Sequence, residues 1–173
     1  MEYYETQIEG FRIRKAGRDD IPVVLELIKE LAEYEKMSDD VVATPELLEE
    51  WIFDKEKAHV LLGEAEGEIV GMALYFYNFS TFLGRAGIYL EDLYVKPSMR
   101  GSGMGKALLT RLTRIAVEEG CGRMEWSCLN WNTPSIGFYK SLGAVPMDEW
   151  TVYRLTGDVL KGLGSDGKGI SRR

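Results

Sequence analysis

Apolar positions recur along this chain at two different spacings, and the spacing changes from one segment to the next. Helical spacing dominates two segments, whose apolar positions are Val24, Leu27, Ile28, Leu31 and Tyr34, and then Met104, Leu108, Leu109, Leu112, Ile115 and Ala116. Runs rich in β-branched and aromatic residues at 58–65, 68–78 and 87–95 have the composition typical of strands. We therefore expect amphipathic helices that alternate with short strands.

Capping and turn residues set the expected boundaries. Asp19-Asp20 followed by Pro22 predicts the start of the first helix, and Thr44-Pro45 predicts the start of a second. Glu66-Gly67 predicts a tight turn between two strands, and a loop is expected over 79–85. The other expected elements are strands at 11–15, 123–128 and 150–155, an end of the Met104 helix near Gly120, and a helix from Asn132-Thr133-Pro134 to Gly143. This order predicts an α/β (α+β) fold with a mixed, mostly antiparallel central sheet.

Length and charge narrow the class of protein. A chain of 173 residues suits one folded domain, which we place at residues 1–160. From 161 to 173 the chain is rich in glycine, and a disordered tail is expected there. The formal net charge of −7 argues against nucleic acid as a partner and favours a cationic substrate.

The residue types exclude two kinds of site. Cys121 and Cys128 lack C-x-x-C spacing, and His59 is the single histidine, beside a hydrophobic strand where we expect a structural role. A metal site or a Ser-His-Asp triad therefore lacks its ligands or its base, and no metal is expected. Neither a signal peptide nor an apolar run long enough to span a bilayer is recognised, so we expect a cytoplasmic protein with no membrane partner.

The segment from Glu91 to Lys106 carries the most chemistry, because a strand there enters a turn with glycines at 101, 103 and 105. Backbone N–H groups of such a turn, at the positive end of a helix, are suited to phosphate. A Walker loop is excluded, since Arg100 stands where its first glycine belongs and Ala107 where its hydroxyl belongs. The G-x-G-x-x-G motif also fails, because its last glycine falls on Lys106 or Leu108. A glycine-rich turn without a ligand is the structural alternative.

The remaining pattern, Arg-Gly-x-Gly-x-Gly after Val-Lys-Pro, resembles the pyrophosphate loop of the GNAT family of acetyl-CoA-dependent N-acetyltransferases. Further segments narrow the resemblance to the spermidine/spermine (diamine) acetyltransferase branch: 27–35, 89–92, 131–144 and Trp150 with its acidic pair. The similarity extends from about Phe11 to about Leu160. It implies the GNAT fold, with helices on both faces of the sheet and strands splayed at the acetyl-CoA cleft, and it implies a homodimer.

The resemblance also implies two ligand sites, one for acetyl-CoA and one for a small cationic amine. The coenzyme positions are Leu93, Tyr94, Val95, Arg100, Gly101, Ser102, Gly103, Met104, Gly105, Lys106, Asn132, Ser135 and Tyr139. The amine positions are Tyr34, Glu35, Glu91, Trp126 and Glu149. Helix capping is the alternative role of Asn132 and Ser135, and a solvated surface is the alternative for Glu35 and Glu149.

Acetyl transfer to an amine needs a proton acceptor, because a free alkylammonium has a pKa near ~10.4. Glu91 is the candidate base. Strand alternation points it the same way as Tyr89, Leu93 and Val95, where burial raises the pKa of a carboxyl group. An ion-paired structural carboxylate is the alternative. By the same alternation Asp92 points to the opposite face, where a structural or remote electrostatic role is expected.

Tyr139 is the candidate acid, because the resemblance places its hydroxyl near the coenzyme sulfur. From the residues alone, Tyr139 is equally a core aromatic beside Phe138. Direct attack in a ternary complex is preferred over an acyl-enzyme at Cys128, since free cysteines are more often packing residues.

The acceptor is less narrowly defined than the reaction. Polyamine-using relatives tend to carry an aspartate before Gly84, where this chain reads Asn78-Phe79-Ser80-Thr81-Phe82. The expected acceptor is therefore a small primary amine: a polyamine, a diamine or a lysine-like amino acid such as thialysine. Two alternatives stay open, which are acetylation of a protein or peptide amine and a non-catalytic acetyl-CoA sensor.

Overall fold

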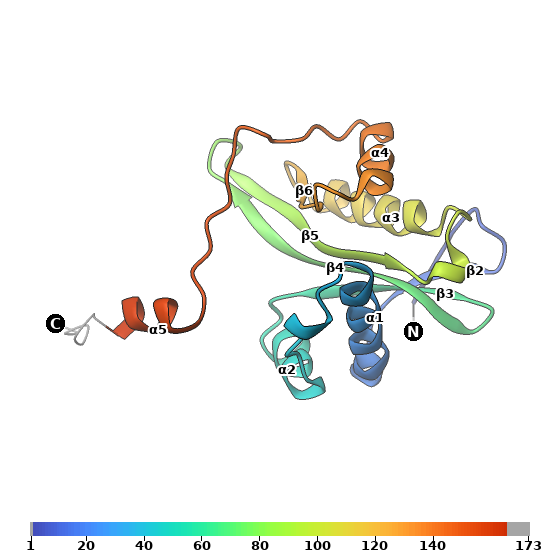
Figure 1. Ribbon diagram of the computed structural model, residues 1–173. Helices are drawn as coiled ribbons and strands as arrows, with labels where there is room; N and C mark the ends of the chain where they lie inside the picture. Colours follow the sequence, from blue (N-terminus) through green and yellow to red (C-terminus); the bar gives the residue numbers. More distant parts are fainter. Residues whose placement is uncertain (1, 166–173) are drawn as a thin grey trace. The chain divides into compact units, whose positions relative to one another are not determined.

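The centre of the protein is a six-stranded mixed sheet in the order β1-β2-β3-β4-β5-β6 (Figure 1). The computed structural model describes residues 2–165, within two compact units that meet in sequence at Ser127 and Cys128. The strands, all in the first unit, are β1 (Tyr3–Glu5), β2 (Phe11–Lys15), β3 (His59–Ala65), β4 (Glu68–Ser80), β5 (Arg85–Val95) and β6 (Met124–Trp126). Neighbouring strands are antiparallel except β5 and β6, which are parallel.

Helices connect the strands at the positions that the capping residues predict. They are α1 (Ile21–Tyr34), α2 (Pro45–Glu49, continued by a π turn over Glu50–Asp54), α3 (Met104–Glu118), α4 (Thr133–Ser141) and α5 (Gly157–Ser165), with short 3₁₀ turns at Arg18–Asp20, Ser38–Asp40 and Pro97–Met99. Thr44 caps α2, since its hydroxyl accepts a hydrogen bond from the Leu47 N–H. Gly120 and Gly143 follow α3 and α4 in the left-handed region, as expected for helix C-termini.

Both faces of the sheet are covered, which explains why the central strands are apolar on both sides. On one face α1 and α2 pack on the sheet (Figure 1), and Val24 and Leu27 join a buried cluster with Leu62, Met72 and Tyr94. On the opposite face the apolar stripe of α3 packs. Gly63 leaves no room for a side chain there, because an added Cβ would lie 2.6 Å from the Phe11 ring and 3.6 Å from Leu108. Helices on both faces of the sheet are therefore confirmed.

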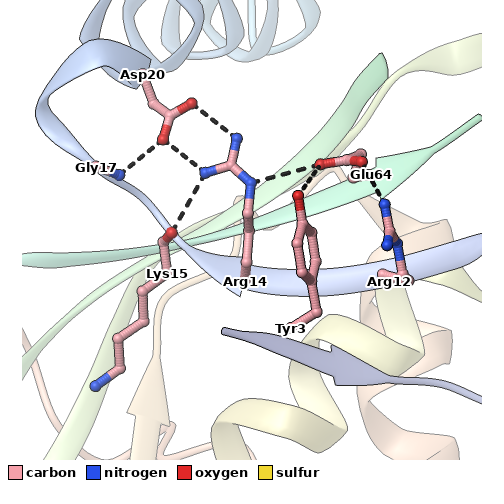
Figure 2. Close-up of polar contacts among 7 residues, drawn as sticks. All are labelled: Tyr3, Arg12, Arg14, Lys15, Gly17, Asp20 and Glu64. Atoms are coloured by element: carbon pink, nitrogen blue, oxygen red, sulfur yellow. Dashed lines mark hydrogen bonds and ion pairs between the residues drawn. The ribbon is translucent and has the colours of Figure 1, made fainter. Parts of the chain in front are cut away.

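A buried ion network ties the start of α1 to the sheet (Figure 2). Arg14, which is 6% exposed, makes two hydrogen bonds of 2.6 and 2.8 Å to the Asp20 carboxylate. Its Nε also lies 3.5 Å from Glu64 on β3, and Glu64 binds two further side chains, Arg12 and Tyr3. Asp20 was expected to cap α1 with its side chain, but its side chain makes no such hydrogen bond. Its carboxylate instead accepts from the Gly17 N–H at 2.7 Å, and the charge of Arg14 holds it in place.

The β4–β5 ladder contains a β-bulge at Glu91, the candidate base. Asp92 pairs with Leu74 and Leu90 pairs with Tyr75, so Glu91 is an extra residue without a partner on β4. A bulge of this kind resets the alternation of side chains along the bulged strand. Asp92 therefore shares the α1 face with Tyr94, and Glu91 no longer alternates in step with Leu93 and Val95.

Beyond the bulge, one edge of β5 is open. Only Ile88–Leu90 of β5 pair with β6, so from Glu91 to Val95 that edge has no strand partner within residues 2–165. The Tyr94 carbonyl points to Gly71 of β4, and the Lys96 N–H donates to Val70. Because backbone groups alternate along a strand, the N–H and C=O groups of Leu93 and Val95 point to the open edge. Pairing of β5 with β6 therefore ends at Leu90, and the splay of the strands at the acetyl-CoA cleft stays a prediction.

Four points about the expected elements need correction. Strand β1 was not foreseen, because three polar-aromatic residues carry too short a pattern to recognise. Strands β4 and β5 extend to Ser80 and from Arg85, so the expected loop over 79–85 shrinks to a turn. The prediction of a final strand near 150–155 is wrong, since this exposed segment pairs with none of the described strands. In the expected tail, residues 161–165 lie in α5, and 166–173 lie outside the described residues.

Candidate active site

The glycine turn before α3 presents a row of free backbone donors. Gly101 and Gly103 have φ values of 80° and 85°, a region that favours glycine, and they turn the chain into the helix. None of the N–H groups from Gly101 to Lys106 donates a hydrogen bond within residues 2–165, whereas the Ala107 N–H donates to Gly103. Helix α3 is long enough for its N-terminus to carry a partial positive charge. The turn can therefore bind an anion through its backbone.

Arg100, at the start of this turn, is directed to β5 and α1. Its Nε donates to the Val95 carbonyl at 2.9 Å, and its guanidinium lies 4.8 Å from the centre of the Tyr34 ring and 5.4 Å from that of Tyr94. The contact occupies one of the acceptors on the open edge of β5. Arg100 thus connects the anion-binding turn to the end of α1 through a hydrogen bond and two cation–π contacts.

Two carboxylates, Glu35 and Glu91, act on a third, Asp92, where α1 ends and β5 bulges. Glu35 follows α1, Glu91 is the bulged residue, and Asp92 is its neighbour on β5. Loss of hydration, followed by the negative charges of Glu91 and Glu35, raises the pKa of Asp92 to about 6. Burial also raises the pKa of Glu35. The carboxylates at the end of α1 and at the bulge are therefore within electrostatic reach of one another.

This arrangement corrects the expected burial of Glu91. Glu91 is exposed, whereas simple alternation had placed it with Leu93 and Val95 in a buried position. Asp92 lies on the face opposite Leu93 and Val95, as expected, and it is the carboxyl group whose pKa is raised. The roles of both residues stay predictions.

Three other amine-site candidates are Trp126, Tyr34 and Glu149. Trp126 is the last residue of β6 and is paired beside Leu90, so it borders the same open edge of β5 as the bulge. Tyr34 lies under the Arg100 guanidinium. Glu149 is exposed in a turn of the second unit. Tyr34, Glu35 and Glu91 thus belong to the end of α1 and the bulge, all within the first unit. Glu149 belongs to the second unit.

In the second unit, α4 carries the remaining coenzyme candidates. Asn132 is buried and caps the helix, its Oδ1 accepting from the Ser135 N–H at 3.4 Å. Tyr139 is half-buried, and its ring centre lies 5.4 Å from that of Phe138. The capping role of Asn132 is therefore observed, and its role toward the coenzyme stays a prediction, as does the role of Tyr139.

Other potential sites are less promising. No group of three or more His, Cys, Asp or Glu side chains within residues 2–165 is arranged to hold a metal ion. His59 lies between the rings of Tyr75 and Tyr77, with centroids at 5.3 and 5.6 Å, which agrees with a packing role. A cavity of about 350 Å³ is lined by Glu2, Tyr4, Lys15, Ala16 and Gly17, none of which is a predicted site residue. No described helix is both long and apolar enough to cross a membrane.

Comparison with known proteins now identifies the family. Residues 24–144 match the acetyltransferase (GNAT) family. The chain is 39% identical to thialysine N-epsilon-acetyltransferase of Bos taurus, over 87% of this chain and 95% of that protein. It is 33% identical to the human spermidine/spermine N(1)-acetyltransferase-like protein 1, over 90% of this chain and 24% of that protein.

A solved structure has a similar fold. An integron cassette protein from the mobile metagenome of V. cholerae superimposes with a TM-score of 0.76 at 26% identity, over 90% of this chain and 98% of that one. The sequence matches cover most of the chain and include the glycine turn, the bulge and α4. The chain therefore belongs to the GNAT family of acetyltransferases and is an N-acetyltransferase related to the spermidine/spermine branch.

Proposed function

We propose that this N-acetyltransferase moves an acetyl group from acetyl-CoA to the terminal primary amine of a lysine-like amino acid such as thialysine. The observation that carries the proposal is the 39% identity to the bovine thialysine enzyme over 95% of that enzyme's length. A match over whole chains includes the parts that select the acceptor, whereas the glycine turn alone is common to enzymes with many acceptors.

The neutral segment Asn78-Phe79-Ser80-Thr81-Phe82 supports a short acceptor. The resemblance implies that polyamine-using relatives tend to carry an aspartate in this segment, which a long polycation can pair with. Here the Asn78 amide donates to Glu125 at 3.0 Å, and Glu125 also binds Arg123 at 2.9 Å. The segment contains no carboxylate, so it offers no additional negative charge to a distant ammonium.

The residues of the first unit fit the coenzyme. Acetyl-CoA supplies an acetyl thioester when it is bound. The free N–H groups from Gly101 to Lys106 suit its pyrophosphate, with Arg100 and Lys106 as nearby cations. The outward N–H and C=O groups of Leu93 and the outward N–H of Val95 suit an extended arm that adds to the open edge like a strand. We propose that Tyr94, Ser102, Met104, Asn132 and Ser135 complete this site.

We propose that Glu91 accepts a proton from the acceptor's ammonium, directly or through water, and that Tyr139 donates the proton which the leaving sulfur needs. The neutral nitrogen then attacks directly in a ternary complex, with no acyl-enzyme. Tyr34, Glu35, Trp126 and Glu149 would line the amine site. We also propose a cytoplasmic homodimer in which the two units of each chain act as one domain, since the family match at 24–144 crosses their boundary.

The first test is release of free thiol from acetyl-CoA with thialysine, lysine, ornithine, putrescine, spermidine, spermine and a short peptide. We expect the highest kcat/KM with thialysine or lysine. A clear preference for spermidine or spermine would replace the acceptor by a polyamine, the second candidate that the similarity to the human protein supports. Preference for the peptide would assign a protein acceptor, and tight coenzyme binding without any turnover would assign a sensor.

Variants of the two proton-transfer residues test the mechanism separately. Glu91→Gln and Tyr139→Phe are expected to bind coenzyme A as the parent does and to lose about 10²-fold or more in kcat, the usual contribution of general acid–base groups. Calorimetric titration with coenzyme A and steady-state kinetics provide the two readings. Full activity in either variant would remove that residue from the proposed mechanism.

A further inference from the structure

Arg100 is a cation whose position is fixed without a carboxylate. Its Nε donates to the Val95 carbonyl at 2.9 Å, and its guanidinium lies 4.8 and 5.4 Å from the centres of the Tyr34 and Tyr94 rings. It forms no ion pair with any acidic side chain in residues 2–165. A guanidinium that is held by neutral groups keeps its positive charge available to a ligand.

The ring of Tyr94 is a rigid support for this guanidinium. Tyr94 is 4% exposed and belongs to the buried cluster that α1 forms with the sheet. Its hydroxyl donates to Glu30 of α1 at 3.0 Å, and Glu30 also lies 3.5 Å from Lys96 Nζ. Core packing and this hydrogen bond together leave the ring little freedom to move.

Tyr34 supplies the second ring from a different element. It is the last residue of α1 and is 37% exposed, and its ring lies closer to the guanidinium than that of Tyr94 does. The resemblance assigns Tyr34 to the amine site, yet the contact observed for its ring is with Arg100, at the start of the anion-binding turn. The geometry therefore connects Tyr34 to the opposite ligand.

Arg100 directly precedes the row of free donors in that turn. The N–H groups from Gly101 to Lys106 donate to no residue in the range 2–165. Fixed N–H groups beside a fixed guanidinium make a preorganised site for an anion, because neither has to be ordered when the anion binds. Arg100 also occupies the Val95 carbonyl, so a ligand strand on the open edge of β5 finds no free acceptor there.

We propose that Tyr34 is a positioning residue of the coenzyme site, which together with the buried ring of Tyr94 holds Arg100 so that its charge acts on the pyrophosphate. The inference rests on the proposed coenzyme site, and this role of Tyr34 is additional to the one proposed for it at the amine. Tyr34 acts through Arg100 and does not touch the pyrophosphate. The extended arm of the coenzyme then pairs with β5 no further than the Val95 N–H.

Loss of the Tyr34 ring should weaken coenzyme binding only through Arg100. We expect Tyr34→Leu to raise the Kd for coenzyme A about twofold to fivefold, the range of an exposed cation–π contact, and Tyr34→Phe to bind as the parent does. Arg100→Leu removes the charge itself and should raise the Kd about tenfold or more. In the Arg100→Leu background, Tyr34→Leu should have no further effect, because the ring then has no cation to hold.

The experiment is calorimetric titration of the full chain with coenzyme A. It compares the parent, the three single variants and the double variant of Tyr34→Leu with Arg100→Leu. Tyr77→Leu is the matched control, because Tyr77 is 40% exposed, lies in the first unit and is assigned no role in either ligand site. Thermal unfolding of each variant shows whether a change in affinity accompanies a change in stability.

Three results would overturn the inference. One is parent-like affinity in Tyr34→Leu, and another is a loss that is the same with and without Arg100. The third is an equal loss in Tyr34→Phe or in the Tyr77→Leu control, because the effect would then come from the hydroxyl or from general destabilisation and not from the ring.

The titration needs no acceptor, so it separates this inference from the proposed function. If the expected pattern appears but no amine of the panel is acetylated, the proposed acceptor is wrong and the role of Tyr34 stands. If amines are acetylated and Tyr34→Leu raises only the KM for the amine, Tyr34 serves the amine site alone and the inference is wrong. If Arg100→Leu binds coenzyme A as the parent does, the backbone of the turn is sufficient and the inference is also wrong.

Discussion

At the scale of single residues, Asp92 is a carboxyl group in an unfavourable environment. Its ionised form is poorly hydrated and is repelled by Glu91 and Glu35, so the folded protein binds a proton at this carboxyl more tightly than the unfolded chain does. A carboxyl whose folded-state pKa is raised stabilises the fold least when it is ionised. The contribution of Asp92 to stability is therefore lost as the pH rises through about 6.

Replacing Asp92 by asparagine should accordingly stabilise the protein at neutral pH. The pKa of about 6 corresponds to a penalty of about 1 to 3 kcal/mol above that pH, relative to an ordinary aspartate. We expect Asp92→Asn to raise the free energy of unfolding by that amount at pH 7.5 and by little at pH 4. Urea denaturation at both values is the measurement. A loss of stability at pH 7.5 would mean that Asp92 has a stabilising partner.

At the scale of elements, the turn into α3 contains three glycines. Gly101 and Gly103 have positive φ values that favour glycine, and Gly105 does not. Gly103 has a φ of 85°, which strains any residue with a Cβ. Gly105 lies in the first turn of the helix, and an added Cβ would meet Val95 Cγ2 at 3.8 Å, an ordinary contact. The backbone conformation therefore explains why residue 103 is glycine. It does not explain the glycine at 105, for which close approach of a ligand is the remaining reason.

We predict different outcomes for the two alanine variants. Gly103→Ala should lose about 1 kcal/mol of stability from backbone strain. Gly105→Ala should keep or slightly increase its stability, by up to about 1 kcal/mol, and should bind coenzyme A about tenfold more weakly if phosphate approaches the bare backbone there. Thermal unfolding and calorimetric titration separate the two effects. Parent-like coenzyme affinity in Gly105→Ala would show that phosphate does not approach this residue.

At the scale of the whole molecule, the segment from 145 to 155 displays more apolar surface than a lone chain usually keeps. Six of its large apolar side chains are each more than half exposed, namely Val145, Met147, Trp150, Val152, Tyr153 and Leu155. A standard interface buries about 800 Å² per partner, and side chains of this size and number provide an area of that order. The proposed homodimer offers an occupant, since a second copy of the chain would cover the segment of its partner.

The dimer prediction can be tested with paired substitutions. We expect the parent chain to sediment as a dimer at micromolar concentration, and Val152→Glu with Tyr153→Glu to weaken association at least tenfold by placing charge in the interface. Val42→Glu is the matched control, because Val42 is equally exposed but lies in the first unit. A monomeric parent would refute the homodimer, and a dimer unaffected by the paired substitutions would place its interface on another surface.

Local rules explain what the sequence alone determined about this protein. The starts of α1 and α2, the ends of α3 and α4 and the turn at Glu66-Gly67 follow from proline, glycine and capping residues, whose preferences act over a few positions. The glycine turn and its family resemblance were readable for the same reason. The amphipathic helices α1 and α3 followed from the periodicity of their segments, and their places on opposite faces of the sheet were implied by the family resemblance.

Tertiary structure alone decided the matters that depend on a neighbour. The bulge at Glu91 arises from the register with β4, which strand alternation in one segment cannot reveal. The β-prone segment 150–155 forms no strand, because pairing requires a free partner edge as well as propensity. Arg100 binds the Val95 carbonyl and the rings of Tyr34 and Tyr94, residues distant from it or on other elements. Register, burial and pairing are properties of contacts between segments, so they become defined only when the segments pack together.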